Sequence, residues 1–132
     1  MGWSGSGQAL TDTHDFNGDG KSDIAWRNTD GNLAIWLMNG TTVLSSPDLG
    51  NVPTSWTVVG QRDFNGNGHA DILWRNTNGD LAIWFMNGTT VTSSTDLGNV
   101  STSWTIVGQR DFNGHGYADL LWRNTDATWR FG

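Results

Sequence analysis

The sequence predicts an all-β fold built from copies of one small antiparallel unit, and three observations support this prediction. The first is a period of 48 residues, because Asp15-Phe16-Asn17-Gly18 recurs at 63–66 and again at 111–114. The second is that 15–62 and 63–110 are identical at 37 of 48 positions. The third is a composition rich in Gly, Trp, Asn and Thr, which favours short strands joined by tight turns.

The period divides the 132 residues into two parts. Residues 1–14 match the repeat poorly, and we expect them to form an N-terminal arm or a diverged strand. Residues 15–132 form a repeat array with copies at 15–62, 63–110 and, as a partial copy, 111–132. The whole length suits one domain rather than two.

One repeat length, read from residue 56 across the boundary between the first two copies, shows the expected strands in chain order. Residues 56–61, rich in β-branched and aromatic side chains, predict the first strand, and 71–76 predict the second, after an Asp/Asn/Gly loop. Asn-Gly pairs at 78–79 and 87–88 indicate type I′ hairpin turns. They place an antiparallel third strand at 81–86 and a fourth strand that begins at 89–93.

The third strand indicates how these units pack. Side chains alternate along a strand, so two apolar sets lie on opposite faces: Leu33, Ile35 and Leu37, and Ala34, Trp36 and Met38. A sheet that is apolar on both faces must be covered on both, as the blades of a β-propeller are. A β-trefoil is the alternative, which the long period disfavours. Because a propeller ring has about four to eight blades, we expect several chains to complete one ring as a homo-oligomer.

The Asp/Asn/Gly loop is the strongest functional motif. In the first copy, side-chain oxygens occur at loop positions 1, 3, 5 and 9, contributed by Asp15, Asn17, Asp19 and Asp23. The carbonyl of Lys21 adds an oxygen at position 7. Calcium takes six to eight hard oxygen ligands, and short acids on a tight loop can wrap one ion. Position 12 is a Trp instead of the bidentate Glu of an EF-hand, and strands flank the loop, so it is not an EF-hand.

This loop and its repeat resemble the FG-GAP or VCBS blade of integrin-α-like propellers, and the propeller lectins are similar. The resemblance covers residues 15–132 and is most specific in the nine-residue loop. It implies a loop that joins the first two strands of a blade and binds calcium, with Asp15, Asn17, Asp19 and Asp23 matching in full. It also implies an extracellular or cell-surface location.

The other two loops depart from that pattern. The second loop, with Asp63, Asn65, Asn67 and Asp71, has an amide at position 5, and the third loop has His115 there. Side-chain carboxylates therefore fall from three to two, and calcium affinity is expected to fall from the first loop to the third. The alternative is that the loops are Asx-turns, in which Asp and Asn bind their own main chain; it is favoured for the third loop.

Tryptophan and arginine suggest a second kind of site. Five mid-strand tryptophans are assigned to the core: Trp26, Trp36, Trp74, Trp84 and Trp122. Trp56 and Trp104 instead end connectors that strand parity places beside the hairpins between the second and third strands. Shallow sugar pockets are thus expected at Arg27/Asn28/Trp56 and at Arg75/Asn76/Trp104. The alternative is a structural Arg that stacks on Trp and binds turn carbonyls.

Composition limits the function further. Seven Lys and Arg against 13 Asp give a net charge of −6, and Lys21 is the single Lys, so nucleic acid is not an expected partner. No apolar run is long enough for a membrane helix, and no signal segment begins the sequence. No Ser-His-Asp set has the sequence context of a catalytic triad, and no pair of acids occurs outside the loops. The sequence therefore does not indicate an enzyme. We expect a calcium-stabilised, carbohydrate-binding propeller, or alternatively a self-assembling scaffold, engineered or fragmentary, without a small ligand.

Overall fold

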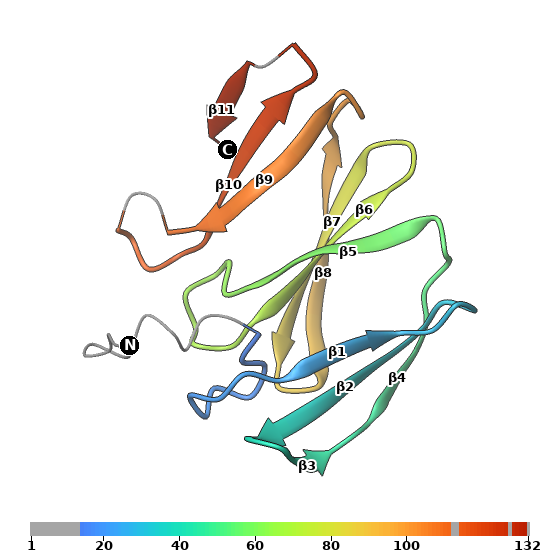
Figure 1. Cartoon of the computed structure of the whole chain (residues 1–132), viewed down its shortest axis with the longest axis vertical. Coiled ribbons are helices and arrows are strands. Elements are labelled where there is room, and N and C mark those ends of the chain that lie inside the picture. Colours follow the sequence, from blue (N-terminus) through green and yellow to red (C-terminus); the bar gives the residue numbers. More distant parts are fainter. Residues whose placement is uncertain (1–13, 112–113, 127, 132) are drawn as a thin grey trace.

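The computed structural model describes residues 14–111, 114–126 and 128–131 (Figure 1). The predicted arm or strand at 1–14 lies outside these residues except for His14. The described residues form three antiparallel sheets, which confirms the all-β prediction. Among them, no helix is long and apolar enough to cross a membrane.

Each sheet is one blade, and the first strand of the second and of the third blade comes from the end of the preceding repeat copy. The first blade contains β1 (Ile24–Arg27), β2 (Asn32–Asn39), β3 (Thr42–Ser45) and β4 (Asp48–Asn51). The second blade contains β5 (Trp56–Arg62), β6 (Asp71–Asn76), β7 (Asp80–Asn87) and β8 (Thr90–Asn99). The third blade contains β9 (Trp104–Arg110), β10 (Asp119–Asn124) and β11 (Trp129–Phe131). The blades follow one another from the blue end of the molecule to the red end and do not close into a ring (Figure 1).

The hairpin turns lie where they were predicted but are not of type I′. That type needs positive φ at both central residues, whereas Asn78 and Asn87 have negative φ. Gly88 is the first central residue of the β7–β8 turn, with φ 65°, as a type II′ turn requires. Gly79 closes a turn in which its N–H donates to the carbonyl of Asn76 at 2.9 Å.

The fourth strand differs between the first two blades. In the second blade β8 runs without interruption and Thr95 pairs with Ile83. In the first blade the equivalent position is Pro47, and β3 ends before it while β4 begins after it. Proline has no N–H to donate to a strand ladder, so the strand is divided there. The carbonyl of Pro47 still accepts from the N–H of Ile35 at 3.1 Å.

Two apolar clusters hold the blades together. The first lies between the first two blades and combines Leu33 and Ile35 with Ile72 and Trp74. The second lies between the second and third blades, with Leu73, Leu81, Ile83 and Trp122 at its centre. The two faces of the second blade thus contribute to different clusters, as predicted for a blade that is apolar on both faces.

The assignment of Trp26 to the core was wrong. Trp74 and Trp122 are buried, but the equivalent Trp26 is 48% exposed. The pairing with the neighbouring strand is the same, because Trp26 lies 5.1 Å from Trp36 just as Trp74 lies 5.1 Å from Trp84. The difference is that no described residue covers this face of the first blade.

The turns and connectors lie on two rims, as strand parity predicted. At one rim the connector after β4 binds the β1–β2 hairpin, since the Val52 N–H donates to the Gly31 carbonyl at 2.9 Å. At the other rim the Asp/Asn/Gly loop of the first repeat meets the β7–β8 turn. There the Gly88 N–H donates to the Phe16 carbonyl at 2.8 Å. The two candidate sites therefore lie on opposite rims.

Candidate functional site

The first Asp/Asn/Gly loop is organised around Asp15, whose side chain is buried. Its Oδ1 accepts the N–H groups of Gly18 at 2.9 Å and Asp19 at 3.2 Å, and its Oδ2 accepts that of Gly20 at 2.8 Å. Asn17 Oδ1 also accepts from the N–H of Asp19, at 3.3 Å. These bonds make the loop a set of turns closed by its own side chains, as the Asx-turn interpretation describes.

Asp23, at loop position 9, joins the loop to the sheet. Its Oδ2 accepts the Phe16 N–H at 2.9 Å and its Oδ1 accepts the Met38 N–H at 2.9 Å. Burial raises the pKa of this carboxyl, and the negative charges of Asp19 and Asp15 raise it further, against the lowering effect of the two N–H bonds. The charges of Asp15 and Asp19 therefore lie close enough to Asp23 to repel the charge of its carboxylate.

The second loop repeats this skeleton. Asp63 accepts three main-chain N–H groups, those of Gly66, Asn67 and Gly68. Asp71 accepts two, those of Phe64 and Met86. Asp71 is fully buried. Burial, with a smaller contribution from the charge of Asp63, raises the pKa of Asp71 to about 6. Asn65 and Asn67 are exposed, and Asn67 Oδ1 accepts from the N–H of His69 at 3.0 Å.

The third loop is more open. Asp111 is exposed, and its two carboxylate oxygens accept the N–H groups of His115 at 3.0 Å and Gly116 at 2.7 Å. The Gly116 bond is the main reason why the pKa of Asp111 is lowered. Phe112 and Asn113 lie outside the described residues, so the third loop is only partly described.

Successive loops are bonded to each other. The Ala70 N–H donates to the Asp15 carbonyl at 2.7 Å, and the Ala118 N–H donates to the Asp63 carbonyl at 3.0 Å. His69 Nδ1 adds a contact of 2.9 Å to the Phe16 carbonyl. Each loop thus rests on the loop of the next repeat through a main-chain bond.

Arg27 is the centre of the second candidate site, on the opposite rim. Its guanidinium donates to four carbonyls, at 2.6–3.2 Å, those of Gly31, Val52, Pro53 and Trp56. A guanidinium has five N–H groups, so one of them is left for another partner. Arg75 repeats three of these bonds one repeat later, to Val100, Ser101 and Trp104.

Each of these arginines also lies over a tryptophan of the next blade. The guanidinium carbon of Arg27 is 4.8 Å from the ring centroid of Trp74, and that of Arg75 is 5.3 Å from Trp122. The ring that each arginine covers is therefore a buried strand residue and not the connector tryptophan. This is the stacked, carbonyl-bonded arrangement that was the alternative to a sugar pocket.

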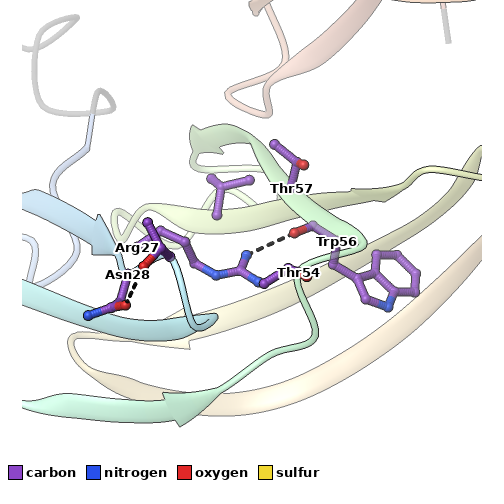
Figure 2. Close-up of a pocket in the computed structure, with 7 residues that line it drawn as sticks. Arg27, Asn28, Thr54, Trp56 and Thr57 are labelled. Atoms are coloured by element: carbon purple, nitrogen blue, oxygen red, sulfur yellow. Dashed lines mark hydrogen bonds between the residues drawn. The ribbon is translucent and has the colours of Figure 1, made fainter.

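A cavity of about 350 Å³ nevertheless lies where Arg27, Asn28 and Trp56 meet. It opens between the first two blades, and the remaining lining residues are Thr29, Thr54, Thr57 and Val58. Figure 2 shows the Arg27 guanidinium reaching the main-chain oxygen of Trp56 while the indole ring extends away from it. Asn28 is exposed, and its Oδ1 accepts from Thr29 Oγ1 at 3.3 Å.

The second predicted set is arranged differently. Trp104 lines a smaller cavity of about 180 Å³ together with Trp122 and Arg130. The guanidinium carbon of Arg130 lies 5.3 Å from the Trp104 ring centroid, so this ring already has a cation over one face. Arg75 binds the carbonyl of Trp104, and Asn76 donates to Ser55 Oγ at 3.4 Å.

Comparison with protein families gives a match to a repeat that includes all three Asp/Asn/Gly loops. The description FG-GAP-like repeat matches twice, over residues 15–74 and 63–122. The chain belongs to the FG-GAP-like repeat family. Comparison with curated proteins and with solved structures gave no match.

The FG-GAP-like loops can be tested for their fit to a cation. No described cluster of three or more His, Cys, Asp or Glu side chains is arranged to hold a metal ion. The chemistry of the first loop is nevertheless suitable, since a carboxylate has about four acceptor positions and Asp23 uses two of them. Mutual repulsion of Asp15, Asp19 and Asp23 is what a divalent cation would relieve.

Some residues at these sites were not expected from the sequence of the FG-GAP-like repeats. His69 was assigned no role, but it links two loops. Gln109, which is Gln61 in the preceding copy, donates from Nε2 to the Val59 carbonyl of the preceding blade at 2.6 Å. Arg130 stands where the second repeat has Ala82, and that departure from the repeat was the available signal.

Proposed function

We propose that this chain is a calcium-stabilised, propeller-type module that binds carbohydrate. The observation that carries the proposal is the cavity of about 350 Å³ in which Arg27, Asn28 and Trp56 come together between two blades. Aromatic faces stack on the apolar faces of sugar rings, and hydroxyl and amide groups around such a face bind the sugar hydroxyls.

In this proposal the residues of the cavity have different roles. Arg27 ties the connector to the β1–β2 hairpin through four carbonyl bonds, one of them to Gly31 in the hairpin, and has about one N–H left for a ligand. Recognition therefore depends on the partly exposed Trp56 ring, on Asn28 and on the hydroxyls of Thr54 and Thr57. One platform and few polar groups predict weak binding of a single sugar.

Calcium in this proposal serves the fold and not a reaction. Asp15, Asn17, Asp19, the Lys21 carbonyl and Asp23 would hold the ion in the first loop, with a weaker site at Asp63, Asn65, Asn67 and Asp71. When bound, the ion supplies positive charge to carboxylates that otherwise repel each other. Sites with few carboxylates suit the calcium concentrations outside the cell, where FG-GAP-like repeats are typically found.

A structural scaffold is the second candidate function, and a specific observation favours it. Arg27 and Arg75 each bind three or more carbonyls and cover a buried tryptophan, which is sufficient to explain why they are present. In this case the cavity is a surface depression without a ligand, and the repeats serve assembly alone. We propose no enzymatic reaction for either candidate.

A glycan array separates the two candidates. The intact chain is labelled and applied to the array with calcium and, in parallel, with a chelator. The lectin proposal predicts binding to a related group of glycans, weakened by the chelator because the blades are less stable. If the chain binds no glycan in the presence of calcium, the result would support the scaffold function instead.

A further inference from the structure

The two contacts between blades use the same residues of the repeat. In the first, Arg27 covers Trp74, and Leu33 and Ile35 belong to the same cluster as that ring. In the second, Arg75 covers Trp122, and Leu81 and Ile83 belong to the same cluster as that ring. One face of a blade thus presents a tryptophan, and the opposite face presents an arginine with aliphatic neighbours.

The first blade leaves one of these faces exposed. Ile24 is 40% and Trp26 is 48% exposed, and Trp36 packs beside Trp26. The equivalent residues of the second blade are identical: Ile72, Trp74 and Trp84. There Ile72 and Trp74, the equivalents of Ile24 and Trp26, are fully buried in the cluster shared with the first blade. The exposed face of the first blade, which we call the tryptophan face, is therefore half of a contact that the chain already contains.

The third blade leaves the opposite face exposed. Leu121 and Arg123 of β10 are the equivalents of Leu73 and Arg75, and β11 adds Trp129, which is 54% exposed. The guanidinium carbon of Arg123 lies 5.2 Å from the Trp129 ring centroid. We call these three residues the arginine face.

We propose that the tryptophan face of one copy of this chain binds the arginine face of a second copy, head to tail, with Arg123 over Trp26 of the second copy. The partner is a second copy because the arginine and the tryptophan of this contact are the pair that joins the blades in both internal contacts, although Trp129 takes the position of Leu81 on the arginine face. A planar guanidinium has two faces, so Arg123 can hold Trp129 on one side and Trp26 of the second copy on the other.

A head-to-tail contact has a definite symmetry. It joins two different surfaces, so a pair of copies still has one free surface of each kind after the first contact forms. Such contacts either close into a ring or continue as an open filament. The internal contacts relate successive blades of a propeller-type repeat, so we expect the same contact between copies to continue that arrangement into a ring. The contact needs no ligand and is independent of the proposed function.

The test uses two variants that each remove one surface. Trp26→Asp alters the tryptophan face and Arg123→Asp alters the arginine face, while Leu97→Asp serves as a control. Leu97 is 49% exposed but lies on β8 of the second blade, away from both exposed end faces. Mass is measured by light scattering over a wide range of protein concentrations, together with far-ultraviolet circular dichroism.

The proposal predicts that the unaltered chain and Leu97→Asp form oligomers of defined size. Each face variant should require at least about a tenfold higher concentration to associate, as expected for loss of an interface hot spot. An equimolar mixture of the two face variants should form a dimer, because one intact tryptophan face and one intact arginine face remain. That recovery also shows that both variants are folded.

Three results would overturn the proposal. If the unaltered chain remains monomeric at every concentration, the two faces do not bind each other, and their partner would be a different protein with propeller-type blades. Oligomers that persist in both face variants would place the contact elsewhere on the surface. Face variants that are each monomeric and do not combine in the mixture would exclude a head-to-tail contact.

Discussion

The guanidinium of Arg27 covers the ring of Trp74 in the next blade at 4.8 Å while its N–H groups bind four carbonyls. One side chain therefore fixes the connector that enters the second blade and also packs against the strand that follows. The same guanidinium donates to the carbonyls at the rim and covers the buried tryptophan. The position of the rim is therefore coupled to the position of the core.

Replacement of this arginine should be costly. Arg27→Ala removes one donor from each of four carbonyls, of which Gly31 and Pro53 keep a main-chain N–H donor, and it uncovers Trp74. We therefore expect a loss of about 2–4 kcal/mol in the free energy of unfolding, measured by urea denaturation. Arg27→Lys should recover only a small part, because an ammonium group cannot reproduce the planar fork. Arg123→Ala, at a protein concentration that keeps the chain monomeric, is the matched control with a small expected loss. Equal losses in Arg27→Ala and Arg123→Ala would show that the contacts of Arg27 with the carbonyls and with Trp74 do not stabilise the fold.

Replacing a glycine should cost more stability at the rim that carries the connectors, where Gly79 lies, than at the rim that carries the Asp/Asn/Gly loops, where Gly88 lies. Gly79 has φ 97°, and a Cβ added there would collide with the Val100 carbonyl. Gly88 has φ 65°, but an added Cβ would meet no atom within 4 Å. Gly79→Ala should therefore lower the free energy of unfolding by more than about 2 kcal/mol and Gly88→Ala by less, in urea denaturation. The reverse order would mean that the connector does not hold the hairpin closely.

Calcium should stabilise the fold through the first loop. A ligand that binds only the native state at about 100 times its Kd adds about 2.7 kcal/mol to the free energy of unfolding. The melting temperature should fall with a chelator and recover with calcium. Asp19→Ala should remove most of this response, whereas His115→Ala should leave it almost unchanged. A melting temperature that changes with neither chelator nor calcium would support the interpretation of the loops as Asx-turns without a bound ion.

Without calcium, stability should depend on pH through Asp71. Burial raises the pKa of this carboxyl to about 6 in the folded chain, from 3.8 ordinarily. Between these values the folded state binds more protons than the unfolded state, so stability falls as pH rises from about 4 to about 6 and then levels off. Melting curves in chelator should show this fall, and Asp71→Asn should reduce it. Asp30→Asn is the control, because the second repeat has Asn78 at that position. An unchanged slope in Asp71→Asn would assign the effect to other groups.

Carbohydrate binding should depend on Trp56 and on repetition of the site. We expect weak binding to free monosaccharide and much tighter binding to a surface of clustered glycans, because linked sites raise the effective concentration. The double variant Trp56→Ala with Trp104→Ala should lose both, measured by calorimetry and by surface binding, and should remain folded. Retained binding would place the pocket elsewhere, and an unfolded variant would assign these rings to the core.

Local signals in the sequence predicted most of the fold. The 48-residue period, the alternation along the third strand and the Asn-Gly turns are short-range features, and they place the strands, the two rims and the loops correctly. Pro47 was a readable signal for the divided fourth strand, since proline cannot donate to the ladder. The turn type was wrong because Asn-Gly pairs also suit turns in which only the glycine has positive φ.

The partners of the arginines could not be predicted in the same way. Sequence reasoning placed Arg27 beside Trp56 because both lie on one rim, and the cavity does bring them together. It could not tell which ring the guanidinium covers, because Trp74 comes near only when two sheets pack. The exposure of Trp26 has the same cause, since its sequence context is that of the buried Trp74.

The spacing of the contacts between blades has a consequence for the history of such chains. Arg27 and Trp74 are 47 residues apart, as are Arg75 and Trp122, so each junction joins neighbouring repeats at fixed positions. Unequal recombination that inserts or deletes one whole repeat would recreate the same junction with no further mutation. Blade number is therefore free to change in a single genetic event, while a change of a few residues in the period would disrupt every junction it touches.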